Sequence, residues 1–244
     1  MIVLAAHCDD AALSLGAAIS SGRLGKVRTA VFFSISKYTR HAPGTGDEKA
    51  VTALRRREEC AAAKLCGYEP LFLGLPEPFV RPGYALDDLR DVSRDPRADP
   101  VFPAARAAAQ RLGAAGDPLL FPLAAGGHID HRILASIGKE FCRRGLVAGF
   151  YEDIPYATRW GRAKTAAFAR AEYGGLLTRR LALARKGRVS PKRRALLCFH
   201  SQLSAAQVSD LMRRTRGVRG EAIWLTPVGE GMFSEGASPQ GSRR

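Results

Sequence analysis

The sequence predicts an α/β fold of the Rossmann-like type, in which helices cover both faces of an open, largely parallel sheet. Short apolar runs alternate with longer helical segments over the first two thirds of the chain. Of the 244 residues, 46% are hydrophobic and 25% charged, a globular composition that excludes a disordered or collagen-like chain. Metal-competent side chains also follow two of the predicted strands, where open α/β sheets bind ligands.

The predicted strands are continuous apolar runs, as expected in a sheet that is covered on both faces. They are residues 2–6, 27–33, 70–75, 119–122 and 147–151, with a late strand at 222–225. The first opens the chain, and the fourth leads into a glycine-rich loop.

The predicted helices lie between these strands and fill most of the last third. They are residues 11–21, 47–66, 103–112, 133–144, 163–173, 191–203 and 205–216. The second begins with Asp47 and Glu48 and is followed by Gly67, which matches the residue preferences of helix ends. Residues 76–100 are rich in Pro, Asp and Arg and predict a long excursion with little regular structure.

The length suits one substantial domain, and we expect it to span residues 1–235, followed by a flexible basic tail at 236–244. No apolar run approaches the roughly 18 residues that a membrane span needs. The five cysteines have no CxxC spacing, which argues against a disulfide framework and predicts a cytoplasmic protein.

The net charge of +15 is concentrated in the second half of the chain. Residues 1–131 hold 16 basic against 15 acidic side chains, a net of +1, and residues 132–244 hold 22 against 8, a net of +14. Residues 179–194 alone contain eight basic side chains and no acidic one. Such a field attracts phosphates, acidic carrier proteins or nucleic acid.

Two short clusters carry side chains that can bind metal. One is His-Cys-Asp-Asp at residues 7–10, and the other is His-Ile-Asp-His at residues 128–131. Three of the five histidines fall in these clusters. A hydrolytic zinc site takes three His or carboxylate ligands and leaves a fourth position for water, and the two clusters together can supply that set.

The clusters also match a known pair of signatures. Residues 6–10, Ala-His-Cys-Asp-Asp, resemble the Ala-His-Pro-Asp-Asp-Glu signature of the PIG-L/LmbE family of zinc-dependent N-deacetylases. Residues 128–131 are similar to its His-x-Asp-His signature. Further similar segments are the helix with Glu59, residues 73–77 and 151–157, and Ser201-Gln202. The chain departs from the pattern at Cys8, which replaces proline, and at Ala11, which replaces glutamate.

The resemblance implies an LmbE-like fold and one Zn²⁺, or another divalent metal, per chain. Its ligands would be His7, Asp10 and His131, and Asp9 would be the general base that activates the bound water. His128 would stabilise the oxyanion and protonate the leaving amine, with Asp130 holding its ring.

Four residues are candidates for substrate contacts: Arg56, Glu77, Glu152 and Tyr156. Each has an alternative reading. Arg56 is one of three consecutive arginines and can equally be a surface residue, Glu77 can cap a loop, and the turn that holds Glu152 and Tyr156 can be structural.

The expected function is hydrolytic removal of an N-acetyl or other N-acyl group from an amino sugar or glycoconjugate. The basic segment 179–194 would flank the mouth of the site and attract an anionic part of this substrate. One alternative is a nucleic-acid-binding protein, although this segment lacks aromatic interleaving, so no specific nucleic acid is expected. Another is a catalytically weakened deacetylase relative used as an interaction module.

Overall fold

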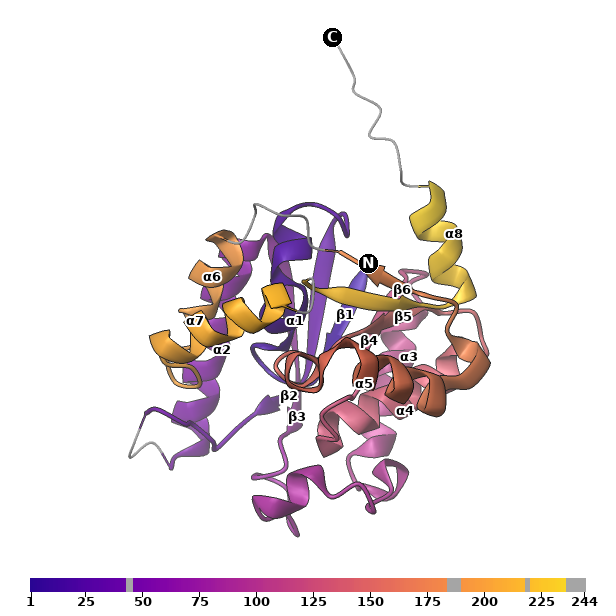
Figure 1. Ribbon diagram of the computed structural model, residues 1–244. Helices are drawn as coiled ribbons and strands as arrows, with labels where there is room; N and C mark the ends of the chain where they lie inside the picture. Colours follow the sequence, from indigo (N-terminus) through magenta and orange to yellow (C-terminus); the bar gives the residue numbers. More distant parts are fainter. Residues whose placement is uncertain (43–45, 184–189, 218–219, 236–244) are drawn as a thin grey trace.

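The computed structural model describes residues 1–42, 46–183, 190–217 and 220–235. Its centre is a seven-stranded sheet in the order β3-β2-β1-β4-β5-β7-β6 (Figure 1). The first five of these strands run parallel, β7 runs antiparallel to β5, and β6 runs antiparallel to β7. The strands are β1 (Ile2–Ala5), β2 (Val27–Ile35), β3 (Tyr68–Pro76), β4 (Leu119–Pro122), β5 (Val147–Tyr151), β6 (Arg180–Ala182) and β7 (Ala222–Leu225). The predicted α/β fold with a largely parallel sheet is confirmed.

Helices cover both faces of the sheet (Figure 1). On one face lie α1 (Asp10–Ser20), α2 (Glu48–Cys66), α6 (Ser190–Leu196) and α7 (Ala205–Gly217). On the other lie α3 (Phe102–Gly113), α4 (Ile129–Cys142) and α5 (Tyr156–Tyr173). The remaining helical elements are α8 (Pro227–Glu235) and the short 3-10 turns η1 (Asp87–Arg90), η2 (Pro96–Ala98) and η3 (Gly174–Leu176).

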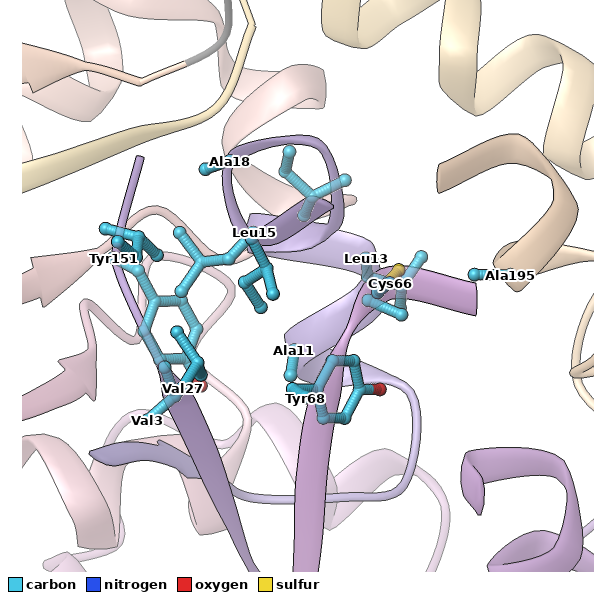
Figure 2. Packing of buried hydrophobic residues seen from close by; sticks show 14 of the residues in the cluster. Val3, Ala11, Leu13, Leu15, Ala18, Val27, Cys66, Tyr68, Tyr151 and Ala195 are labelled. Atoms are coloured by element: carbon cyan, nitrogen blue, oxygen red, sulfur yellow. The ribbon is translucent and has the colours of Figure 1, made fainter. Parts of the chain in front are cut away.

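The two faces have separate hydrophobic cores. In the core on the α1 side, Figure 2 shows Leu15 beside Tyr151 and Val27, and Leu13 beside Cys66. On the opposite face α4 packs closely because residue 138 is glycine: a Cβ there would lie 2.7 Å from the ring of Phe150. Helices α1 and α4, which begin at the two predicted metal-binding clusters, are therefore held by close packing against the sheet.

Some elements differ from the sequence-based expectation. Helix α4 begins at Ile129 instead of residue 133, and α6 ends at Leu196 instead of residue 203. Strand β6 and helix α8 were not predicted, because β6 has only three residues and α8 contains two glycines, so neither carries a clear periodic pattern. The tail at 236–244 lies outside the described residues.

Strands β1 and β4 are neighbours at the middle of the sheet, and successive strands extend outward from them in opposite directions. This is the switch point of an open α/β sheet, where ligands bind beyond the carboxyl ends of the strands. The two predicted metal-binding clusters lie at the ends of the loops that lead from β1 to α1 and from β4 to α4. None of the helices in the described ranges is long and apolar enough to cross a membrane.

Candidate metal and active site

The first half of the site is the junction between β1 and α1. Asp9 has φ 115° and ψ −28°, a left-handed conformation that L-residues rarely adopt. Its backbone N–H donates to Oε2 of Glu59 on α2 at 3.0 Å. The N–H of His7 donates to Oδ2 of Asp10 at 2.8 Å, which closes a tight turn. Strained backbone of this kind concentrates at functional sites, where neighbouring structure holds it in place.

The second half is the junction between β4 and α4. His128 is the N-cap of α4, and its Nδ1 accepts a hydrogen bond from the backbone N–H of Asp130 at 3.3 Å. A neutral histidine that accepts at Nδ1 carries its proton on Nε2. Asp130 and His131 lie in the first helical turn, and both are buried.

The two junctions meet around the Asp10 carboxylate. Its Oδ2 is 3.7 Å from Nδ1 of His7 and 3.4 Å from Nε2 of His131. The opposite ring nitrogens are also paired: Nε2 of His7 lies 2.9 Å from Oδ2 of Asp130, and Nδ1 of His131 lies 2.5 Å from Oδ1 of Asp153. A carboxylate behind each ring is the usual support of a metal-bound histidine, because it fixes both the tautomer and the ring orientation.

A third histidine adjoins this group. Within the part of the chain that the structure describes, His7, His128 and His131 can each direct a ligand atom to one point, with these atoms within 4.8 Å of one another. Two sets of three metal ligands are therefore available. Both contain His7 and His131, and the third ligand is Asp10 in one set and His128 in the other. Imidazole nitrogens with a carboxylate oxygen fit Zn²⁺ and related divalent cations.

The site is also rich in buried acidic groups. Burial, reinforced by neighbouring carboxylates, raises the pKa of Asp9 well above its ordinary value, and burial raises the pKa of Glu59 and Glu77 to about 7. Burial alone would lower the pKa of His131, but Asp10 and Asp153 raise it to about 9. A bound cation would relieve this repulsion among carboxylates, so the electrostatics also fit a metal.

A cavity of about 270 Å³ opens above these groups. Its floor contains both histidine junctions, and its mouth contains Tyr38 and Phe79, whose stacked rings have centroids 5.1 Å apart. The predicted site residues that line it are His7, Asp9, Asp10, Glu77, His128, His131 and Tyr156. Three arginines line it as well: Arg40, Arg55 and Arg90.

Arg56 does not line this cavity, and the prediction of a substrate contact there is corrected. Its Nη2 donates to Oγ of Ser34 at 3.2 Å, and its guanidinium lies over the ring of Phe72. Instead the preceding Arg55 reaches the site, where it pairs with Glu77 and lies 3.6 Å from Oδ2 of Asp9. Successive residues on a helix point about 100° apart, so only one of the run can face the cavity. Arg55 and Arg56 lie four and three residues before Glu59, and both spacings share a helix face with it, so the sequence carries no local signal that separates the two arginines.

Glu152 also lies away from the cavity. Its carboxylate accepts hydrogen bonds from Nε and Nη2 of Arg180 at 2.6 and 2.9 Å, and from Nε1 of Trp224 at 3.1 Å. It therefore joins β5 to β6 and β7. The next residue, Asp153, points to the site and orients His131, because successive side chains in extended backbone point in opposite directions.

The expected role of Asp130 needs a similar correction. Its carboxylate contacts His7 and Arg81, not the ring of His128, which is held by the backbone amide of Asp130. The reason is that α4 begins earlier than predicted, which makes His128 the N-cap and turns the Asp130 side chain toward β1.

The basic segment 179–194 does not supply the arginines of the mouth. Arg179 pairs with Glu230 and Arg180 with Glu152. Residues 184–189 lie outside the described residues, and none of the described residues of this segment lines the cavity. All three cavity arginines come instead from the half of the chain with a net charge of +1.

The chain is similar to known proteins in both sequence and fold. No family model matches the sequence. A curated relative, 2'-N-acetylparomamine deacetylase of Streptomyces fradiae, is 32% identical over 164 residues, which cover 64% of this chain and 57% of the relative. The solved structure of A40926 pseudoaglycone deacetylase matches 92% of this chain and 95% of its own, with a TM-score of 0.65 and 20% identity. The chain is related to the PIG-L/LmbE deacetylases.

Other solved structures share the fold at low sequence identity. The zinc-inhibited form of teicoplanin deacetylase covers 91% of this chain and 95% of its own, with a TM-score of 0.62 and 17% identity. A 4-carboxy-2-hydroxymuconate hydratase from Pseudomonas putida covers 92% of this chain and 94% of its own, with a TM-score of 0.55 and 16% identity. The same fold therefore carries a different reaction in that protein, so activity has to be argued from the site.

Proposed function

We propose that this chain is a zinc-dependent N-deacetylase that removes an N-acetyl or other N-acyl group from an amino sugar or glycoconjugate. The observation that carries the proposal is the pair of carboxylate-backed histidines, His7 and His131, that face Asp10 at the floor of the cavity. The deacetylase names of the sequence relative and of several fold neighbours support it.

His7, Asp10 and His131 would hold the metal. When bound, zinc supplies a Lewis acid that polarises the amide carbonyl and lowers the pKa of a coordinated water. We favour Asp10 over His128 as the third ligand because its Oδ2 lies between the two facing ring nitrogens, 3.7 Å from one and 3.4 Å from the other.

Asp9 is the group that would accept a proton from the attacking water. Its carboxylate lines the cavity. Nη2 of Arg55 lies 3.6 Å from its Oδ2, which favours one orientation of the Asp9 carboxylate. Attack of the water oxygen on the amide carbon forms the new C–O bond and opens the carbonyl to an oxyanion. The C–N bond then breaks, and the proton held by Asp9 passes to the departing amine, which leaves a carboxylic acid and a free amino sugar; the acid then loses its proton to water.

His128 would serve the oxyanion. Because its Nδ1 already accepts a hydrogen bond from the backbone N–H of Asp130, its Nε2–H is available as a donor in the cavity. The family resemblance implies that His128 also protonates the leaving amine. We assign that step to Asp9 instead, because Asp9 already holds the proton taken from the water, and we leave oxyanion stabilisation to His128.

The substrate is proposed to carry an anionic group. Counted by formal charge, Asp9, Asp10 and Glu77 balance the three arginines of the cavity lining, so a divalent metal gives the lining a formal net charge of +2. Arg55 is neutralised by Glu77, whereas Arg40 and Arg90 are exposed and have no carboxylate partner among the residues that the structure describes. Arg90 lies over the ring of Tyr156 with its guanidinium 5.0 Å from the centroid, which keeps it beside the cavity.

The test is amine release from a panel of N-acetylated substrates by the zinc-loaded protein. The panel contains N-acetylglucosamine, 2'-N-acetylparomamine, a neutral N-acetylglucosaminide and matched glycosides with a carboxylate or phosphate on the aglycone. We expect release of a primary amine, its loss after chelation, and its return with zinc. Absence of amine from every substrate would contradict the deacetylase proposal. Equal kcat/KM for neutral and anionic glycosides would contradict only the anionic group.

A further inference from the structure

Arg81 lies beneath the candidate metal site and has no role in the mechanism proposed above. It belongs to the excursion between β3 and α3, and its side chain is 5% exposed. Its Nη2 lies 2.7 Å from Oδ1 of Asp130 and 3.1 Å from Oδ2 of Asp99, and its Nη1 donates to the carbonyl of Pro76 at 2.8 Å. These three oxygen partners fix the orientation of the Arg81 guanidinium.

The Asp130 carboxylate connects Arg81 to His7. One oxygen accepts from Arg81, and the other lies 2.9 Å from Nε2 of His7. With the proton of a neutral His7 ring on Nε2, the Nδ1 lone pair faces Asp10. Rotation of the Asp130 carboxylate would remove the partner that specifies this tautomer.

We propose that Arg81 is a positioning residue of the metal site: it holds the Asp130 carboxylate so that His7 offers Nδ1 to the metal. The inference rests on the metal site proposed above. His131 has a different support, because the second oxygen of its partner Asp153 accepts from the backbone N–H of Ala125 at 3.1 Å. A backbone amide cannot be replaced by substitution, whereas the support of His7 depends on one side chain.

A purely structural role has to be separated from this one, because Arg81 also anchors the excursion. Arg132 provides the matched control. It holds the same excursion through the carbonyls of Asp91, Val92 and Arg94, at 2.8–3.0 Å, while its hydrogen bonds do not involve Asp130. Loss of Arg132 therefore loosens the excursion without releasing the carboxylate behind His7.

The experiment measures the affinity of the purified full chain for zinc alone, by competition with a chromophoric chelator. Substitution of a group that supports a metal ligand typically weakens binding by about 10- to 100-fold, and we expect this loss for Arg81→Gln. Arg132→Gln should stay within about twofold of the wild type. Arg81→Gln combined with Asp130→Asn should lose no more than Asp130→Asn alone, because both changes act through one hydrogen-bonded chain.

Circular dichroism and thermal unfolding establish that each variant is folded. Wild-type affinity in folded Arg81→Gln, or an equal loss in Arg132→Gln, would overturn the inference. If Arg81→Gln does not fold, Arg81→Lys decides, because lysine keeps the charge but cannot reproduce the planar fork. A loss of at least threefold in Arg81→Lys supports the inference, and wild-type affinity contradicts it. Absence of zinc binding by the wild type would instead contradict the metal site itself.

Discussion

The junctions after β1 and after β4 contribute to one site by different structural means. At residues 7–10 the chain makes a strained turn in which Asp9 has φ 115° before α1 begins. At residues 128–131 the chain enters a regular helix, with His128 as its cap. The turn presents adjacent carboxylates, and the helix presents histidines three residues apart on one face. Neither junction is complete by itself: the ring of His7 is held by Asp130 of the second junction, and the ring of His131 faces Asp10 of the first.

This comparison shows why the two junctions must be neighbours. A metal-bound histidine directs one ring nitrogen to the metal, which it shares with the other ligands, and needs a hydrogen-bond partner for the opposite nitrogen. His7 finds Asp10 in front within its own turn and Asp130 behind from the second junction. His131 finds Asp10 in front from the first junction and Asp153 behind from the end of β5. The pairing of β1 with β4, and of β4 with β5, therefore assembles both environments.

The largest expected effect comes from deleting a histidine that both donor sets share. His131→Ala should lose most of its bound zinc and with it nearly all activity, because a three-ligand site retains only two protein donors. His128→Gln should keep its zinc and lose rate, since His128 is assigned to the oxyanion. Metal analysis of the purified variants checks both outcomes. Zinc loss in His128→Gln with normal content in Asp10→Asn would replace Asp10 by His128 as the third ligand.

The strained turn is tested by Asp9→Asn. The amide keeps the shape of the side chain but cannot accept a proton, so zinc content should be normal while kcat falls by about 10²- to 10⁴-fold. Steady-state kinetics on a substrate identified by the panel gives the size of the loss. Near-normal turnover in the zinc-loaded variant would mean that another group accepts the proton.

The support behind His131 is tested by a pair of adjacent substitutions. Asp153→Asn should weaken zinc binding by about 10- to 100-fold, because an amide does not hold the ring as a carboxylate does. Glu152→Gln should bind zinc normally and unfold at a lower temperature, because it leaves Arg180 without its charged partner, at a cost of about 1–3 kcal/mol. Chelator competition and thermal unfolding measure the two effects. The opposite pattern would show that Glu152, not Asp153, serves the site.

The smallest expected effect concerns the three arginines of α2. Arg55→Gln should lower kcat/KM by about tenfold, or ~1.4 kcal/mol, because it frees Asp9 and leaves Glu77 without its cation. Arg57 is exposed, and Arg57→Gln should stay within about twofold. Arg56→Gln should resemble Arg57→Gln. A loss at residue 56 that exceeds the loss at residue 55 would reverse this assignment.

Much of the fold follows from local patterns. Apolar runs of four to seven residues predicted β1, β2, β4, β5 and β7 to within two residues at their ends, because burial on both faces demands them. The signatures at residues 6–10 and 128–131 identified a related family, and the comparisons confirm that relationship. The same two signatures contain the proposed metal ligands and the proposed base.

Other features depend on which side chains meet in space, which a single sequence does not encode locally. Which of three consecutive arginines faces the cavity is decided by the rotation of α2 against the sheet. Which of Glu152 and Asp153 faces it is decided by the path of the chain as it leaves β5. The charge at the mouth shows the same limit: the segment richest in basic residues lies elsewhere, and Arg40 and Arg90 reach the cavity from the nearly neutral half. Composition sums charges along the chain, whereas a substrate meets only those that the fold brings to one surface.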